Sequence, residues 1–229
     1  MGVLESVNIA VAAPNPHKTA GRTGIDKRAQ PGLVAVRDPG PKGTGLGSGL
    51  VGDVIGDTEN HGGTDQAVYA VAREVLDEWE GRLERLLPDG SFGENLTTRG
   101  IDVDGALIGE RWRVGDAVEL VVTSPRIPCV TFRHHIDRPG WLKTFTADVR
   151  PGAYLAVAAP GGIRAGDEIR VLHRPGHGVT VAQLFRALTT EKHRLPGLVE
   201  RLGGDAVAEL VQTVAAEAGR AQPAPQGRP

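Results

Sequence analysis

Short apolar runs separated by glycine and proline are the feature that most limits how this chain can fold. The sequence contains 32 glycines and 16 prolines, and many of them stand between these runs. Long helices need uninterrupted stretches, whereas closely spaced turn residues are typical of folds with many short strands. The sequence therefore predicts a mainly β fold.

Apolar and β-branched runs give the candidate strands. They are Gly2–Val11, Leu33–Val36, Gln66–Val71, Ala106–Val114, Ala117–Thr123, Ala153–Ala158 and Glu168–Leu172. The pairs Gly115-Asp116 and Gly166-Asp167 each precede a strand. Glycine and aspartate favour tight turns, so these pairs are typical of the corners of a β-barrel.

A single helix is predicted among the strands. Between Val71 and Leu87, apolar residues including Val75, Leu76 and Trp79 recur at a spacing of three and four residues. Charged residues lie between them, which is the pattern of a helix with one face packed on a core. We expect this helix to end before Pro88.

The chain after Arg174 has a helical pattern. Residues 175–178 form a linker, and Thr180 is placed to cap a first helix. Pro196-Gly197 interrupts a second helical pattern, and Asp205 is placed to cap a third helix. These signals predict a small annex of three helices.

The domain organisation follows from these patterns. We expect a β-barrel domain over residues 1–174, a three-helix annex over residues 179–220, and a disordered tail over residues 221–229, which has almost no apolar side chain to bury. The annex is a candidate surface for a homodimer or for a partner protein, and periodicity does not decide between them.

Charge and cysteine content narrow the class of protein. The chain has 26 basic and 28 acidic residues and one cysteine. A net charge near zero argues against binding of a nucleic-acid polymer or an anionic membrane. The single cysteine argues against a disulfide-stapled fold, and no stretch approaches the roughly 20 apolar residues of a membrane span. Because no basic leader precedes the first strand, we expect a cytoplasmic protein.

Cys129 is the best candidate for a chemically active side chain. It stands at the end of an apolar run closed by Pro125 and Pro128, and Arg126 lies nearby to favour the thiolate. A thiolate serves as a soft metal ligand or as a nucleophile. The alternative is a small buried side chain with no chemistry, which is common for single cysteines.

A glycine-rich stretch is a weaker candidate. Gly47-Ser48-Gly49-Leu50-Val51-Gly52 matches the spacing of a dinucleotide-binding loop. No strand precedes it and Asp53 does not open a helix, so the helix N-terminus that would bind a pyrophosphate is missing. We interpret the stretch as a loop over the mouth of the barrel.

Polar residues gather at three other places. His61-Gly62-Gly63 precedes an apolar strand, Glu94-Asn95 follows a glycine, and Thr23 stands shortly before Lys27-Arg28. Glycines beside a histidine let backbone amides approach a ligand, and hydroxyl and cationic groups suit a phosphate. Taken singly, each group is also what an ordinary turn contains.

The order of these motifs resembles the MOSC domain family. The matching stretches are Thr23-Gly24-Ile25 with Lys27, Gly49-Leu50-Val51-Gly52-Asp53, His61-Gly62-Gly63 with Ala67-Val68-Tyr69, Phe92-Gly93-Glu94-Asn95-Leu96, Pro125-Arg126-Ile127-Pro128-Cys129, Gly152-Ala153-Tyr154 and Gly166-Asp167. The resemblance covers roughly Gly2 to Arg174 and is greatest to stand-alone bacterial members. It implies a MOSC-type β-barrel that holds the molybdenum cofactor, with Cys129 as the metal ligand.

The chemistry of the other polar side chains gives them expected roles around such a cofactor. Cys129, His61 and Glu94 are the expected catalytic residues. The expected cofactor-binding residues are Thr23, Lys27, Arg28, His61, Gly62, Gly63, Glu94, Asn95, Arg126 and Cys129. One departure is Val130-Thr131-Phe132, which follows the cysteine where close relatives have a basic residue.

The implied activity is the reduction of small N-hydroxylated compounds such as hydroxylaminopurines or amidoximes. One cysteine cannot hold an iron–sulfur cluster, so the electrons must come from an external flavin or iron–sulfur reductase. Two alternatives stay open at this point. One is a sulfur carrier or cofactor-delivery protein that uses a Cys129 persulfide, and the other is a barrel that binds a ligand without chemistry.

Overall fold

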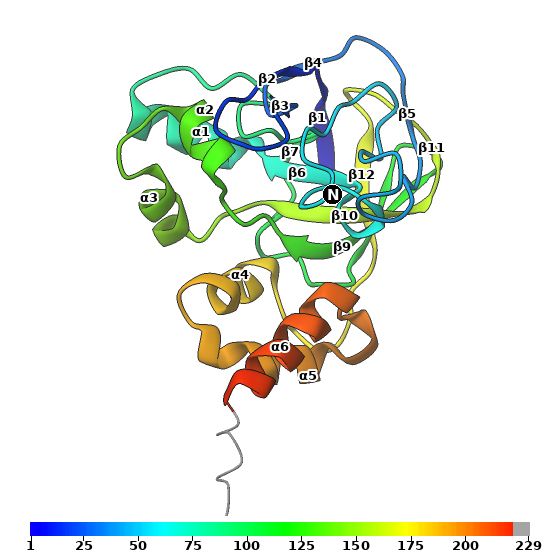
Figure 1. The fold of residues 1–229 in the computed structure, drawn as a ribbon. Helices are drawn as coiled ribbons and strands as arrows, with labels where there is room; N and C mark the ends of the chain where they lie inside the picture. The colour runs from blue at the N-terminus through cyan, green and yellow to red at the C-terminus, as the bar shows by residue number, and fades with distance from the viewer. Residues whose placement is uncertain (222–229) are drawn as a thin grey trace, which may run out of the picture.

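The centre of the molecule is a closed β-barrel. In this computed structural model, which describes residues 1–221, the barrel strands pair in the order β12-β8-β9-β10-β6-β7-β1, and β1 pairs back with β12 to close the ring (Figure 1). Their bounds are β1 Gly2–Ala10, β6 Val68–Ala72, β7 Leu96–Arg99, β8 Arg111–Val114, β9 Val118–Pro125, β10 Ala153–Ala159 and β12 Glu168–His173. The mainly β prediction is confirmed.

Shorter strands extend the barrel. β4, Lys27–Ala29, pairs with the end of β1, and a hairpin of β2, Ala13–Pro14, and β3, Arg22–Thr23, leads into it. β5, Val34–Val36, pairs with β11, Gly161–Ile163. These segments and the loops beside them surround one end of the barrel.

Side-chain alternation builds the barrel interior. Along β9, Val118, Leu120 and Val122 are fully buried, while Glu119 and Val121 between them are partly exposed. This period of two puts every second side chain on the inner face. The apolar runs found in the sequence therefore form the core.

Helix α1, Arg73–Leu83, connects the two barrel strands that pair in parallel, β6 and β7. Parallel neighbours need a crossover connection, and a helix is the usual one. The helix is shorter than the predicted Val71–Leu87, because Val71 belongs to β6 and Glu84 ends the helix in the left-handed conformation at φ 53°.

Two further helices follow β9, and the sequence analysis did not predict them. They are α2, Val130–Ile136, and α3, Trp141–Asp148. Each is short, and α3 begins after Gly140 with no side-chain cap, so neither shows a clear start signal. Together with α1 they enclose a cluster of aromatic rings in edge contact, formed by Trp79, Phe92, Phe132, Trp141 and Phe145.

One predicted strand is shorter than expected. The run Ala106–Val114 forms a strand only over β8, because Gly109 turns the backbone at φ 83°. The Glu110 carboxylate accepts hydrogen bonds from the Trp112 indole N–H at 2.8 Å and the Leu107 N–H at 3.3 Å, which holds this turn.

Three helices form the C-terminal region, α4 Val181–Thr189, α5 Leu195–Leu202 and α6 Ala208–Ala221, below the barrel in Figure 1. Thr180 caps α4 in a capping box with Gln183, as predicted. Two other predictions are wrong. Pro196 does not interrupt a helix but stands in the first turn of α5, where proline is favoured, and Asp205 lies in a 3-10 turn rather than capping α6.

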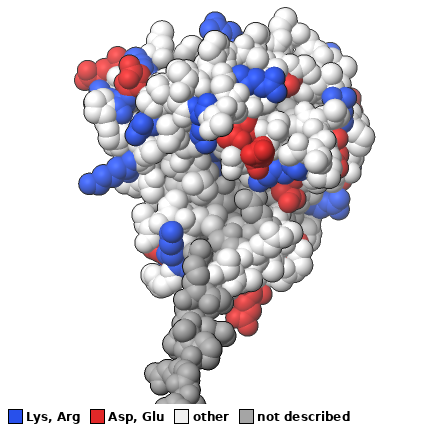
Figure 2. Space-filling model, in the orientation of Figure 1, with Lys and Arg blue, Asp and Glu red and all other residues white. Residues whose placement is uncertain are grey.

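The predicted disordered tail lies outside the described residues, apart from Ala221. Among the residues that the structure describes, no helix is both long and apolar enough to cross a membrane. On the face seen in Figure 2, basic and acidic side chains are interspersed rather than gathered by sign.

Candidate active site

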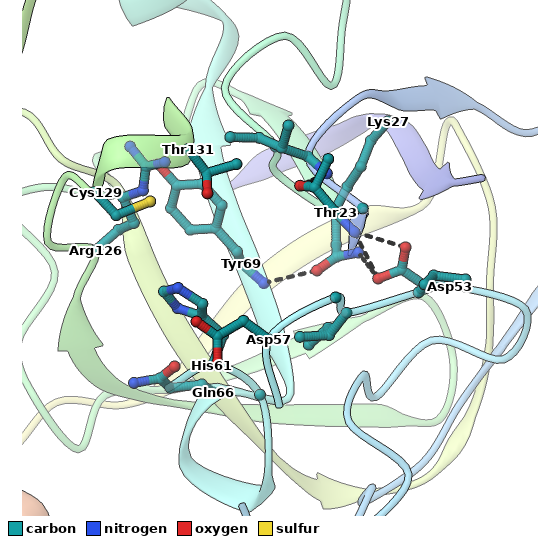
Figure 3. Close-up of a pocket in the computed structure, with 18 of the residues that line it drawn as sticks. Thr23, Lys27, Asp53, Asp57, His61, Gln66, Tyr69, Arg126, Cys129 and Thr131 are labelled. Atoms are coloured by element: carbon teal, nitrogen blue, oxygen red, sulfur yellow. Dashed lines mark hydrogen bonds and ion pairs between the residues drawn. The ribbon is translucent and has the colours of Figure 1, made fainter. Parts of the chain in front are cut away.

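A pocket at one end of the barrel brings the predicted motifs together (Figure 3). Its wall comes from the β2–β3 hairpin and the residues after it, the loop over residues 53–62, strands β6 and β10, the turn before β7, and the segment between β9 and α2. The lining residues that bear on the chemistry are Arg22, Thr23, Lys27, Asp53, Asp57, His61, Gly62, Gln66, Tyr69, Asn95, Arg126, Cys129 and Thr131.

Cys129 stands between a barrel strand and a helix that the core holds in place. β9 ends at Pro125, and Cys129 occupies the N-cap position of α2 with extended backbone angles, φ −119° and ψ 171°. Phe132 on the first turn of α2 is fully buried, with its ring centroid 5.0 Å from that of Phe145 and 5.4 Å from that of Trp141. The aromatic cluster therefore fixes the position of the thiol.

The pocket favours the thiolate form of Cys129. Burial alone would raise the pKa of the thiol, but a hydrogen bond from His61 and the charge of Arg126 outweigh it, and the Phe132 backbone N–H adds to their effect. The resulting pKa is about 6, against an ordinary value of 9.0. The group is therefore mostly ionised at neutral pH, as a soft ligand or a nucleophile requires.

Arg126 is a buried cation with an unused hydrogen-bond donor. Arg126 is 5 % exposed, and its guanidinium lies over the Phe132 ring, 3.6 Å from the ring centroid. Stacking on a ring stabilises the cation without using its N–H groups. Nη1 is buried and has no hydrogen-bond partner among the described residues, so it is available to an acceptor in the pocket.

His61 approaches Cys129 from the loop before β6. Its backbone N–H donates to the Asp57 carbonyl at 3.0 Å. The Asp57 carboxylate has a lowered pKa, because hydrogen bonds from Asn60 and Lys18 outweigh its burial, and the nearby His61 contributes to the effect. Gly62 then turns the chain at φ 79°, where an added Cβ would lie 2.6 Å from the Gly47 carbonyl oxygen. Glycine is thus required for the chain to pass behind the pocket wall.

Lys27 and Asp53 form a buried ion pair on the opposite side of the pocket from His61 (Figure 3). Lys27 Nζ lies 2.6 Å from both Asp53 oxygens. Asp53 also accepts hydrogen bonds from the Ala10 N–H at 2.9 Å, the Ser48 hydroxyl at 2.7 Å and the Asn95 amide at 2.8 Å. Burial opposes the charge, yet these contacts hold the pKa of Asp53 below its usual range.

This ion pair changes the roles expected for Lys27 and Asn95. The ammonium of Lys27 is already paired, so it joins strand β4 to the loop over residues 48–56 as well as lining the pocket. The Asn95 side chain donates to Asp53 and accepts from the Tyr69 N–H at 3.2 Å. Both residues brace the pocket wall through hydrogen bonds within the protein.

Three residues expected at the cofactor do not line the pocket, namely Arg28, Gly63 and Glu94. Arg28 follows Lys27 in strand β4, so alternation turns it outward, where it pairs with Asp26 at 3.0 Å and stays 77 % exposed. The Glu94 carboxylate is fully buried and accepts from the N–H groups of Gly90 and Phe92, at 2.6 and 2.9 Å. Burial raises its pKa to about 7 despite these bonds.

The structure also brings in residues that the sequence analysis did not single out as site residues. Arg22, Asp57, Gln66 and Thr131 line the pocket, and Thr131 accepts a hydrogen bond from Asn15 at 3.1 Å that ties the β2–β3 hairpin to α2. Tyr69 and Asp53 stand in motifs that match the MOSC family, which was a weak indication that they line the pocket. Gln66 begins the predicted strand Gln66–Val71, and nothing in the sequence marks it as a pocket residue.

Comparisons with known proteins agree with this geometry. Residues 57–170 match the MOSC domain. The chain is 33 % identical over 130 residues to the uncharacterized protein YflK of Bacillus subtilis, covering 57 % of this chain and 58 % of YflK. It is 32 % identical over 156 residues to a protein named reductase from Gibberella moniliformis, covering 67 % of this chain and 28 % of that protein. The chain thus spans less than two thirds of the length of these curated relatives.

The fold has a solved counterpart. The crystal structure of YiiM from Geobacillus stearothermophilus superposes with a TM-score of 0.75 at 22 % identity, over 94 % of this chain and 98 % of that chain. At this identity the likeness concerns the fold, which has the same barrel and C-terminal helical region. The matched domain, the relatives and the fold agree with the resemblance found in the sequence, and the chain belongs to the MOSC domain family.

Proposed function

We propose that this protein binds a molybdenum cofactor in the Cys129 pocket and reduces small N-hydroxylated compounds with electrons from a partner protein. The observation that carries the proposal is the Cys129 thiolate, which His61 and Arg126 stabilise inside the pocket. The reductase-named relative supports a redox role for a chain of this family.

The residues present fit such a cofactor. Among the described residues no three His, Cys, Asp or Glu side chains converge to hold a bare metal ion. A pterin dithiolene brings its own sulfur ligands, so one protein thiolate suffices to complete a soft coordination sphere. The unpaired Nη1 of Arg126 is a donor for an anionic group of the cofactor. When bound, the molybdenum cofactor supplies oxygen-atom transfer with two-electron redox change.

The protein side chains supply the proton chemistry. Conversion of a hydroxylamine R–NHOH to R–NH2 and water consumes two electrons and two protons. His61 is the titratable group that lies against Cys129, and it is the candidate donor of a proton to the departing oxygen. Glu94 is excluded from this role, because its carboxylate is occupied within the turn before β7.

The electrons enter from outside the described protein. A single cysteine cannot hold an iron–sulfur cluster, and this cysteine is assigned to molybdenum. We therefore propose an external flavin or iron–sulfur reductase as the donor.

The test uses protein made in a host that synthesises the cofactor. Wild type should contain molybdenum and pterin and, when reduced by a viologen, convert an N-hydroxylated purine to the amine. Cys129→Ser should fold and lose bound molybdenum, because a hydroxyl is hard and protonated where the thiolate is soft and anionic. Stoichiometric molybdenum in the serine variant would refute the ligand assignment.

The same nucleophilic thiolate favours one alternative, a sulfur carrier with a Cys129 persulfide. A carrier would release sulfide from Cys129 on treatment with dithiothreitol and would reduce no N-hydroxylated compound when loaded with cofactor. That pair of results would replace the reductase proposal with the carrier.

A further inference from the structure

Gln66 carries a buried hydrogen-bond acceptor that nothing in the described protein satisfies. Its side-chain oxygen, Oε1, is buried and has no hydrogen-bond partner, and the residue lines the Cys129 pocket. Buried polar atoms in native proteins are almost always paired, so an exception in a pocket wall marks a place where a ligand group completes the bond.

The backbone around Gln66 is held on several sides, so the side chain is presented by a rigid segment. Gln66 ends the 3-10 turn Thr64–Gln66, and its N–H donates to the Gly63 carbonyl at 3.0 Å. The next residue, Ala67, accepts from the Gly49 N–H at 2.7 Å. The preceding residue, Asp65, accepts from the Thr123 hydroxyl of strand β9 at 2.5 Å through its carbonyl. Rigid presentation of this kind is what a selective contact needs.

The surroundings of Gln66 indicate the kind of ligand group. Figure 3 shows Gln66 and His61 on one side of the pocket, away from the Lys27–Asp53 pair. His61 is hydrogen-bonded to Cys129, so a ligand that contacts both His61 and Gln66 lies beside the reactive sulfur. A carboxamide oxygen accepts hydrogen bonds and donates none, so the complementary ligand group is an N–H or O–H donor.

Amidoximes and ketoximes both carry the hydroxyl donor, and they differ in whether a second donor lies beside it. An amidoxime has an amino group on the carbon that bears the hydroxylated nitrogen, whereas a ketoxime has carbon there. We propose that Gln66 determines specificity by accepting a hydrogen bond from the amino group of the substrate, so that amidoximes are preferred to ketoximes of the same shape. This inference rests on the proposed reductase function.

The experiment compares Gln66→Met with wild type on benzamidoxime and acetophenone oxime, using cofactor-loaded protein and a viologen. Methionine keeps the length of the side chain and removes the acceptor. We expect KM for benzamidoxime to rise about tenfold, as for the loss of one neutral hydrogen bond, and KM for acetophenone oxime to stay unchanged. Gln30→Met makes the same change at a partly exposed glutamine outside the pocket and should alter neither value.

Two measurements without turnover accompany the kinetics. The urea midpoint of cofactor-free Gln66→Met should equal or exceed that of wild type, because an unpaired buried acceptor is removed. Calorimetry should show that benzamidoxime binds wild type more tightly than acetophenone oxime does, and that the variant loses this difference.

The outcomes separate this inference from the proposed function. The role of Gln66 would be overturned by equal KM changes for both oximes or by a lowered urea midpoint of the variant. Loss of pterin from the variant would also overturn it, because the Gln66 oxygen would then be an acceptor for the cofactor. Absence of reduction by loaded wild type would refute the reductase proposal, and the binding comparison would then decide on Gln66 alone.

Discussion

Replacing Arg126 by methionine tests the electrostatic origin of the Cys129 thiolate. The pKa of the thiol lies at about 6 instead of 9.0, which corresponds to about 4 kcal/mol of preference for the ionised form at about 1.4 kcal/mol per pH unit. Burial works against this preference, so the hydrogen bond from His61, the charge of Arg126 and the Phe132 backbone N–H must together supply it. An opposite charge at close range lowers a pKa by about 1 to 3 units. Without Arg126, the pKa of Cys129 should rise to about 7 to 9.

The assay is the rate of alkylation by iodoacetamide as a function of pH, measured on cofactor-free protein. Only the thiolate reacts, so the midpoint of the profile reports the pKa. Wild type should show a midpoint near 6, and Arg126→Met a higher one. The plateau rate of Arg126→Met should also be higher than that of wild type, because nucleophilicity rises with basicity with a slope of about 0.4 to 0.5. The two profiles should therefore cross, which a simple loss of accessibility cannot produce.

Arg133→Met is the matched control. Arg133 lies on α2, four residues after Cys129, so it is about as near to the cysteine in the sequence as Arg126 is. In contrast to Arg126, the guanidinium of Arg133 is exposed and lies 3.1 Å from the His134 ring nitrogen. This variant should keep the wild-type midpoint. The reasoning is refuted if folded Arg126→Met, with unchanged circular dichroism, keeps a midpoint near 6, or if Arg133→Met shifts the midpoint as much.

Two predictions concern buried carboxylates away from the thiol. Asp53→Asn should lower the free energy of unfolding in urea by about 3 to 5 kcal/mol, because Lys27 is left buried without its counterion, whereas Asp26→Asn on the surface should leave the midpoint unchanged. Burial raises the pKa of Asp104 to about 7 from 3.8, so its contribution to stability is fully present below pH 3.8 and is lost as the pH rises through about 7. At pH 8, Asp104→Asn should therefore have a free energy of unfolding in urea up to about 4 kcal/mol higher than that of wild type, and near pH 4 the two should match. Asp26→Asn on the surface should show no such pH-dependent difference.

The barrel was predictable because the sequence patterns that specify its strands and turns are local. Glycine and proline punctuate the sequence, and the alternation of apolar residues, as in β9, assigns one face of each strand to the core. The predicted strand Ala153–Ala158 differs from β10 by one residue. The sequence does not predict α2 and α3, because their buried aromatic residues form helix faces only through contacts with α1 and with the turn before β7.

The position of the reactive thiol was predictable for a different reason. Cys129 is the single cysteine and follows a strand, so its chemistry did not depend on knowing its neighbours. The sequence also predicts His61 and Arg126 as site residues, and the structure brings both to the sulfur. Their contact depends on the closed barrel, since His61 precedes β6 while Arg126 and Cys129 follow β9.

The roles of the charged and amide side chains depended on partners that the sequence does not reveal. Lys27 and Arg28 form one basic pair in the sequence, yet they point to opposite faces of β4, and the partner of Lys27 is 26 residues away at Asp53. The carboxylate beside a glycine predicted a catalytic Glu94. In the structure this carboxylate instead accepts hydrogen bonds from the backbone of its own turn. Residue type therefore identifies a chemical capacity, and a buried partner decides whether that capacity is used within the protein or remains free for a ligand. Among the residues that line the pocket, Arg126 and Gln66 each have one buried polar atom without a partner in the described chain, and they are the side chains most directly prepared for binding.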